Sequence, residues 1–177
     1  MSNRKLFLGT TLIGGAVVCG FILVGLGVFW YYTPHPNSAT TETLYTNESR
    51  QFSFSSPKGY VVHETDTVVT VENASGDGIQ ILITPVDEDI PIMTAERIRA
   101  DIPDLVITNA EEVAIGDNRM GLAFKSDNLE FDGASREVWF VYPECSRGVC
   151  DPFLYQISTY DRLDPVLKAL FATWTFL

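Results

Sequence analysis

The stretches that decide the fold are REVWFVY, residues 136–142, and FLYQISTY, residues 153–160. Both consist largely of aromatic and β-branched residues, which fit the pleated surface of a β-strand. They lie close together in the sequence, so we expect them to pair as a hairpin with a loop between them. The rest of the fold is predicted outward from this pair.

Short strand patterns continue on the N-terminal side. FSFS at residues 52–55 alternates apolar and polar side chains, and Pro57 and Gly59 end the run. The turn-forming residues 73–78 separate two apolar runs and predict a second hairpin. Further strands are expected at residues 60–63, 68–71, 79–83, 105–107, 112–115 and 120–124.

Two short helices are predicted among these strands. Thr94 can serve as the N-cap of a helix over residues 94–99, and Pro103 ends it. Asp164 and Pro165 open a second helix, because aspartate suits the N-cap and proline the first helical position. Its apolar face would cover the sheet. The predicted fold class is therefore α+β, a mostly antiparallel sheet flanked by two helices.

Residues 6–32 contain no charged side chain. As a helix they would extend about 40 Å, enough to cross a ~30 Å hydrocarbon core. Arg4 and Lys5 precede the run, so the positive-inside rule places the N-terminus in the cytoplasm. The run is too long for a typical cleaved signal peptide, and we expect an uncleaved signal-anchor that contacts the lipid bilayer.

The expected organisation follows from this anchor. Residues 33–46 are rich in Thr, Pro, Ser and Asn and are typical of a flexible linker. We therefore predict a single-pass protein of the cell (plasma) membrane with its folded domain outside. The predicted parts are a cytoplasmic N-terminus at residues 1–5, a transmembrane helix at 6–32, a linker at 33–46 and an extracytoplasmic α+β domain at 47–177.

The net charge and the motifs of the sequence limit the classes of function that we expect. The 177 residues include 12 Lys and Arg against 23 Asp and Glu, a net charge of −11. Phosphate binding needs clustered basic residues, so nucleic acid is not an expected partner. Neither a nucleophile elbow nor a nucleotide-binding glycine motif occurs in the sequence. These observations favour a non-catalytic protein without a cofactor.

Cys145 and Cys150 lie between the two aromatic strands. In a hairpin they would face each other near the base of the loop, where the ~5.5 Å Cα separation of a disulfide is easily met. We predict a structural disulfide, with free thiols or a metal-binding pair as the alternatives. A zinc site needs four ligands, and the C-x4-C spacing differs from the C-x-x-C of redox motifs, so no metal is expected.

Candidate catalytic residues are few. His63 is the one histidine within residues 47–177, so any histidine-dependent mechanism would have to use it. We interpret it as a histidine at the surface end of a strand. The alternative function is an envelope hydrolase that uses cleft carboxylates, which would need two carboxyl groups ~5–9 Å apart.

Two acidic runs raise the alternative of a cation-binding sensor. Residues 87–89 are Asp-Glu-Asp, and residues 128–133 resemble the first half of a calcium-binding loop. Trp139 stands where such a loop needs a bidentate glutamate, so we interpret both runs as solvated turns. Asn47 and Asn73 each fit the N-x-S glycosylation sequon. The predicted partner-binding face is the loop at residues 127–135 together with the hairpin that carries the cysteines.

Two motifs resemble a known family. The opening FSFSSPKGYVV, residues 52–62, resembles the start of PsbP-type domains. The ending DPVLKALFATWTF, residues 164–176, is similar to their closing helix and final Phe. The resemblance covers roughly residues 45–177. It implies an antiparallel sheet flanked by helices and a role in binding or assembling a protein partner, and no functional residue of the family is matched here.

Overall fold

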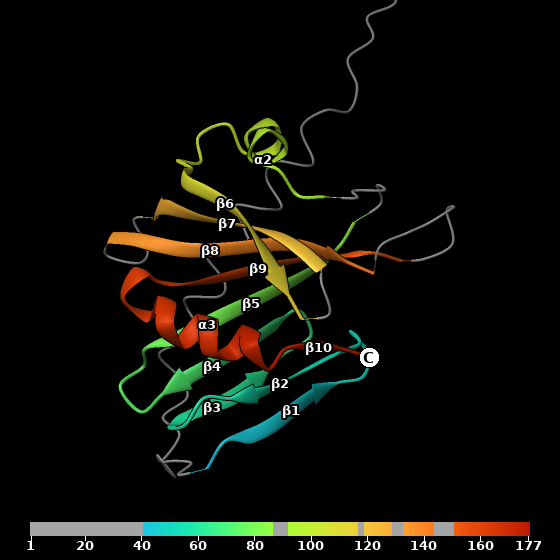
Figure 1. Ribbon diagram of the computed structural model, residues 1–177, viewed down its shortest axis with the longest axis vertical. Helices are drawn as coiled ribbons and strands as arrows, with labels where there is room; N and C mark the ends of the chain where they lie inside the picture. Colours follow the sequence, from blue (N-terminus) through green and yellow to red (C-terminus); the bar gives the residue numbers. More distant parts are fainter. Residues whose placement is uncertain (1–40, 87–91, 117–118, 129–132, 144–150) are drawn as a thin grey trace, which may run out of the picture. The chain divides into compact units, whose positions relative to one another are not determined.

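Seven antiparallel strands form the larger of two sheets in the computed structural model (Figure 1). The structure describes residues 41–86, 92–116, 119–128, 133–143 and 151–177, all within the compact unit Ser38–Leu177. The strand order is β3 (Tyr60–Glu64), β4 (Val68–Asn73), β5 (Gly78–Pro85), β9 (Phe153–Tyr160), β8 (Gly133–Tyr142), β7 (Arg119–Asn128), β6 (Thr108–Ile115). Every neighbouring pair is antiparallel.

The smaller sheet has three strands. Their order is β1 (Thr43–Asn47), β2 (Phe52–Ser56), β10 (Thr175–Phe176). β1 begins at Thr43, inside the stretch whose composition predicts a linker, because it pairs along its whole length with β2. The C-terminal strand β10 pairs with the other edge of β2 and so joins the two ends of the domain.

The two aromatic strands pair with each other, as predicted, and lie in the middle of the larger sheet. Tyr142 pairs with Phe153 and Ser135 with Tyr160, so β8 and β9 form a long antiparallel ladder. Because side chains alternate between the two faces of a strand, β8 contributes to a core on each side of the sheet. Phe140 is fully buried on one face and Trp139 is 8% exposed on the other.

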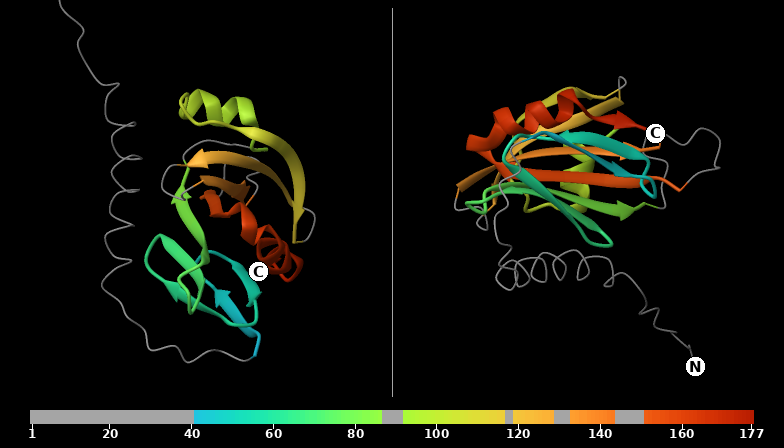
Figure 2. Two further views of the ribbon diagram at one scale, coloured as in Figure 1. Left: turned by 90° about the vertical axis from the view of Figure 1, so that its left-hand side faces the viewer. Right: turned by 90° about the horizontal axis from the view of Figure 1, so that it is seen from below.

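The two α-helices of the described residues lie against opposite faces of the larger sheet (Figure 2). Helix α3 (Asp164–Ala172), preceded by the 3₁₀ turn η2 (Asp161–Leu163), packs with the small sheet over the main core. Helix α2 (Ala95–Asp101) covers a smaller apolar cluster around Phe124 and Trp139. Thr94 is its N-cap, as predicted, and accepts a hydrogen bond from the amide of Arg97.

The main core is dominated by aromatic side chains. Trp174 lies just beyond α3 and stacks on Phe52 of the small sheet, with ring centroids 4.6 Å apart. Phe140 and Tyr155 stack in the same way in the larger sheet, at 4.8 Å. These pairs connect the two sheets and α3 through one continuous apolar layer.

Two predictions need correction. The α+β fold class is wrong, because the described residues form mostly antiparallel strands in two sheets, with α-helices of only 7 and 9 residues. The predicted transmembrane helix, residues 6–32, lies outside the described residues, as does the N-terminus at 1–5. Among the residues that are described, no helix is long and apolar enough to cross a membrane. On this finding the single-pass plasma-membrane location is also corrected, since a span needs about 20 residues.

Candidate functional site

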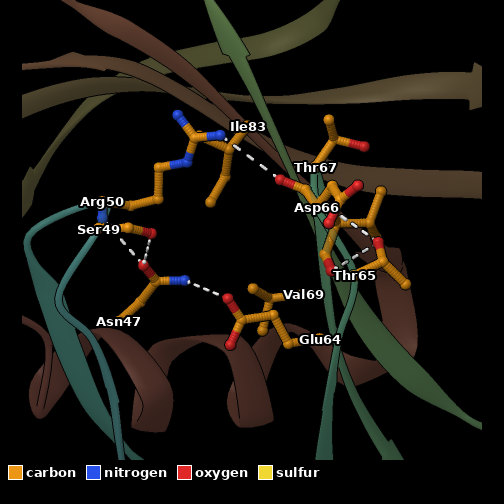
Figure 3. A pocket seen from close by; sticks show the side chains of 10 residues that line it. Asn47, Ser49, Arg50, Glu64, Thr65, Asp66, Thr67, Val69 and Ile83 are labelled. Carbon is orange, nitrogen blue, oxygen red and sulfur yellow. Dashed lines mark hydrogen bonds between the residues drawn. The ribbon is translucent and has the colours of Figure 1, made fainter.

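A pocket of about 590 Å³ opens between two turns of the domain (Figure 3). One wall is the end of β1 and the turn that leads to β2, which contribute Asn47, Ser49 and Arg50. The other wall is the end of β3 and the turn that leads to β4, residues 64–69. Ile83 of β5 closes the pocket from the larger sheet. The pocket is therefore formed where the small sheet meets the large one.

Asn47 holds the two walls together. It is 4% exposed, and its Nδ2 donates to Glu64 Oε1 at 2.8 Å across the pocket. Its Oδ1 accepts from Ser49 Oγ and from the backbone amide of Arg50, both at 2.9 Å. The Asn47 side chain thus fixes the conformation of the β1–β2 turn and its position relative to β3.

Glu64 is the acidic centre of this wall. Tyr45 donates its hydroxyl to Glu64 Oε2 at 2.6 Å, so each carboxylate oxygen accepts a hydrogen bond from the small sheet. Burial, followed by the hydrogen bond to Glu64, raises the pKa of Tyr45 well above its usual value. Tyr45 is therefore a neutral donor at physiological pH.

Arg50 is held at its backbone and along its side chain. The buried Tyr155 donates its hydroxyl to the Arg50 carbonyl at 2.8 Å. The guanidinium carbon lies 4.2 Å from the ring centroid of Phe153, and Nη2 is 3.4 Å from the Asp66 carbonyl oxygen. Arg50 forms no ion pair with any carboxylate of the described residues. Figure 3 shows its side chain reaching from one wall toward the other.

The lining of the pocket suits binding by hydrogen bonds and charge. It combines one guanidinium, two carboxylates and the hydroxyls of Ser49, Thr65 and Thr67. Among the described residues that line the pocket there is no histidine or cysteine. The Ser49 hydroxyl donates to the side-chain oxygen of Asn47.

A second polar cluster lies on the other side of the larger sheet. Glu137 of β8 is 5% exposed and accepts hydrogen bonds from Ser135 Oγ at 2.7 Å, Ser158 Oγ at 2.6 Å and Trp139 Nε1 at 3.3 Å. Burial raises the pKa of Glu137, and these three hydrogen bonds oppose that effect. The neighbouring Ser126 hydroxyl is buried and has no hydrogen-bond partner in the structure. Sequence reasoning missed Glu137, because a single glutamate in an aromatic strand carries no motif.

His63 does not join the pocket. It lies on β3 beside Glu64, and consecutive strand residues point to opposite faces of the sheet. Its side chain is 46% exposed, with Nε2 3.4 Å from Glu72 Oε1. The structure therefore does not bring the histidine into the pocket beside its carboxylates, an arrangement that would have favoured the hydrolase alternative.

The other predicted site residues fall in two groups. Cys145 and Cys150, the acidic run 87–89 and residues 129–132 lie outside the described residues. The polar run 127–135 is less of a loop than predicted, because β7 continues to Asn128 and β8 begins at Gly133. Within the described part of the chain, no three acidic, histidine or cysteine side chains gather as they would around a metal ion.

The two sequon asparagines have different environments. The Nδ2 of Asn47 donates to Glu64 and to the Tyr45 hydroxyl, so the atom that would carry a glycan is already engaged inside the fold. Asn73 lies in the β4–β5 turn, where its side-chain oxygen accepts from the amides of Ser75 and Asp77. The structure thus assigns Asn47 a role in positioning the pocket.

Comparison with known proteins gives a structural likeness but no family or curated relative. No protein-family model and no curated protein matches the chain. A solution structure of cyanobacterial PsbP from Synechocystis matches with a TM-score of 0.48 and 13% identity, covering 83% of this chain and 99% of that one.

Proposed function

We propose that the chain is a non-catalytic protein-binding module that contacts its partner at the pocket between the β1–β2 and β3–β4 turns. The observation that carries the proposal is how Arg50 is held in place and which groups its side chain contacts. Its backbone and the plane of its guanidinium are held in place, yet its side chain meets no carboxylate of the described residues. Arginine held in this way is a frequent anchor of protein interfaces, because its planar fork can form several hydrogen bonds at once.

The absence of a catalytic arrangement at the pocket supports the same function. Nucleophilic catalysis needs a hydroxyl or thiol in contact with a base, and Ser49 instead donates to Asn47. Acid–base catalysis by two carboxylates would need one of them to be held as the acid. Both oxygens of Glu64 accept hydrogen bonds, and Asp66 is exposed at the rim.

The test is site-specific photo-crosslinking of the full chain in its native cells. A photoreactive residue replaces Thr67 at the pocket, and a matched one replaces the exposed Lys168 on α3. We expect a discrete protein to be crosslinked from position 67, not from 168, and the yield to fall about fivefold or more in Arg50→Gln. Equal labelling from both positions, or no discrete protein from position 67, would contradict the proposal.

A further inference from the structure

We propose that the pocket binds a carboxylate group and that Arg50 is the residue that pairs with it. This inference rests on the proposed function, since the carboxylate would belong to the protein partner, as an acidic side chain or a chain terminus. It names the chemistry by which the module recognises that partner.

The first argument is the unmet hydrogen-bonding capacity of Arg50. A guanidinium has five N–H donors, and its one side-chain hydrogen bond to the described residues reaches the Asp66 carbonyl at 3.4 Å, near the limit for such a bond. Five other basic residues of the described part already pair with carboxylates, namely Arg97, Lys125, Arg136, Arg162 and Lys168. Among the described residues Arg50 therefore has no anionic partner, as is also true of Lys58 and Arg99, but of these three only Arg50 lines the pocket.

The second argument is that Arg50 is preorganised. The Asn47 side chain holds its amide, Tyr155 holds its carbonyl, and Phe153 supports one face of the guanidinium. Side-chain entropy that is already lost need not be lost again on binding. A planar fork fixed against an aromatic ring is well suited to a carboxylate, which can accept two parallel hydrogen bonds.

The acidic residues of the pocket determine whether a substitution there strengthens or weakens carboxylate binding. Each oxygen of Glu64 already accepts one hydrogen bond, from Tyr45 or from Asn47, whereas the guanidinium of Arg50 on the facing wall has N–H groups that meet no described acceptor. Asp66 stands exposed at the rim, and its charge opposes an anionic ligand. Removing the Asp66 charge should therefore tighten carboxylate binding, whereas it would weaken the binding of a cation. A phosphate dianion should be disfavoured more strongly than a carboxylate.

The experiment is an NMR titration of the isotope-labelled full chain with small probes. N-acetylglycine supplies a terminal carboxylate, N-acetylaspartate amide a side-chain carboxylate, inorganic phosphate a dianion, and N-acetylglycinamide no charge. The signals followed are the Arg50 Nε–H group and the backbone amides of residues 49–50 and 65–67. We expect both carboxylates to shift these signals with millimolar dissociation constants, and the uncharged amide to leave them in place.

Four variants give the matched comparison. We expect the dissociation constant to rise about tenfold or more in Arg50→Gln, and by less in Arg50→Lys, which keeps the charge but loses the fork. It should fall about two- to threefold in Asp66→Asn and stay unchanged in Lys58→Gln, an exposed residue outside the pocket lining. The stronger of the two carboxylate probes identifies the source of the group in the partner.

Three results would overturn the carboxylate assignment. They are an equal response to N-acetylglycinamide or to phosphate, weaker binding in Asp66→Asn, and full binding in an Arg50→Gln variant that keeps the native spectrum. These results leave the crosslinking outcome untouched. A pocket that crosslinks a partner but ignores carboxylates refutes this inference alone, and a pocket that binds carboxylates but crosslinks nothing refutes the proposed function.

Discussion

The ionisation of Glu137 should affect the stability of the fold. Its carboxyl is buried, it forms no ion pair with a described basic residue, and burial raises its pKa above the ordinary value of 4.5. The folded state therefore holds the proton more tightly than the unfolded state. The stabilisation from the protonated form is complete below about pH 4.5 and is lost as the pH rises through the raised pKa. The contribution of Glu137 to wild-type stability should therefore fall as the pH rises from about 4.5 through the raised pKa.

Glu137→Gln should remove this pH dependence, because the amide keeps the shape of the acid and carries no charge. The neighbouring Ser135 and Ser158 hydroxyls can donate to it or accept from it. Urea unfolding at several pH values between 4 and 8 measures the effect. We expect the variant to gain stability relative to wild type as the pH rises, and Glu112→Gln, an exposed control on β6, to run parallel to wild type. Parallel curves for both variants would contradict the assignment.

Arg136 is a second buried charge, and its effect should be structural. Its side chain is 9% exposed and its Nη2 lies 2.5 Å from Glu111 Oε1. Its Nε lies 3.2 Å from Asp164 Oδ1, although without hydrogen-bond geometry. The residue thus connects β8 with β6 and with the start of α3. Sequence reasoning saw only the start of a strand here, because its two partners are 25 and 28 residues away.

Arg136→Ala should lower the free energy of unfolding by about 2–4 kcal/mol, since it removes the buried stem and both ion pairs. Arg136→Met should cost less, because it keeps the packing of the stem. Lys168→Ala breaks an exposed i,i+4 pair with Asp164 and should cost about 0.5 kcal/mol or less. Chemical denaturation of the three variants checks the order. A loss in Arg136→Ala as small as that in Lys168→Ala would show that the connection is not stabilising.

At the scale of the element, the hairpin β8–β9 is the setting of the disulfide prediction. Tyr142 and Phe153 form a pair at the end of the described ladder, and Cys145 and Cys150 lie between them in the sequence. The bond between these two cysteines stays a prediction.

We expect a Cys145–Cys150 disulfide in the chain isolated under oxidising conditions. Mass spectrometry of a non-reduced digest should show the two peptides joined, and alkylation should label neither cysteine before reduction. Replacing both by serine should cost about 2 kcal/mol at most, because the closed loop is short and the hairpin already constrains it. Complete alkylation without reductant would show that the thiols are free.

The strands that sequence reasoning found and those that it missed differ in their side chains. β8 and β9 are aromatic and β-branched, so local preference and tertiary structure agree. β7 extends beyond the predicted residues 120–124 through Lys125, Ser126 and Asp127, which by composition favour a loop. Lys125 reaches Asp161 at 2.7 Å and Ser126 is buried against β8, contacts that lie far along the chain. Tertiary pairing overrides local preference there.

At the scale of the whole molecule, the pocket could not be predicted from the sequence. Its two walls are turns that are about 16 residues apart, and they are joined by contacts of the Asn47 and Arg50 side chains with Glu64 and Asp66. The sequence did contain a signal, since Asn47-Glu48-Ser49 stands out as a sequon. The sequence does not show that Asn47 is buried. Because it is buried and donates to Glu64, this sequon asparagine connects the two walls of the pocket.

Asn47 should therefore couple the two sheets, and Asn47→Ala tests this. The substitution leaves the Arg50 amide without its acceptor and removes one donor from Glu64. A loss of about 1–3 kcal/mol in the free energy of unfolding is expected. Asn73→Ala is the matched control, because Asn73 also begins a sequon and also accepts amide hydrogen bonds, but within one turn.

Amide hydrogen exchange distinguishes Asn47→Ala from Asn73→Ala better than the free energy of unfolding does, because it shows where protection is lost. In Asn47→Ala, amide protection should fall in the β1–β2 turn and also across the junction, in residues 64–68 of the other wall. In Asn73→Ala the loss should stay within residues 73–78. If the effect of Asn47→Ala were equally local, the two turns would be held independently. The preorganisation of Arg50, on which carboxylate recognition depends, would then have to come from Tyr155 and Phe153 alone.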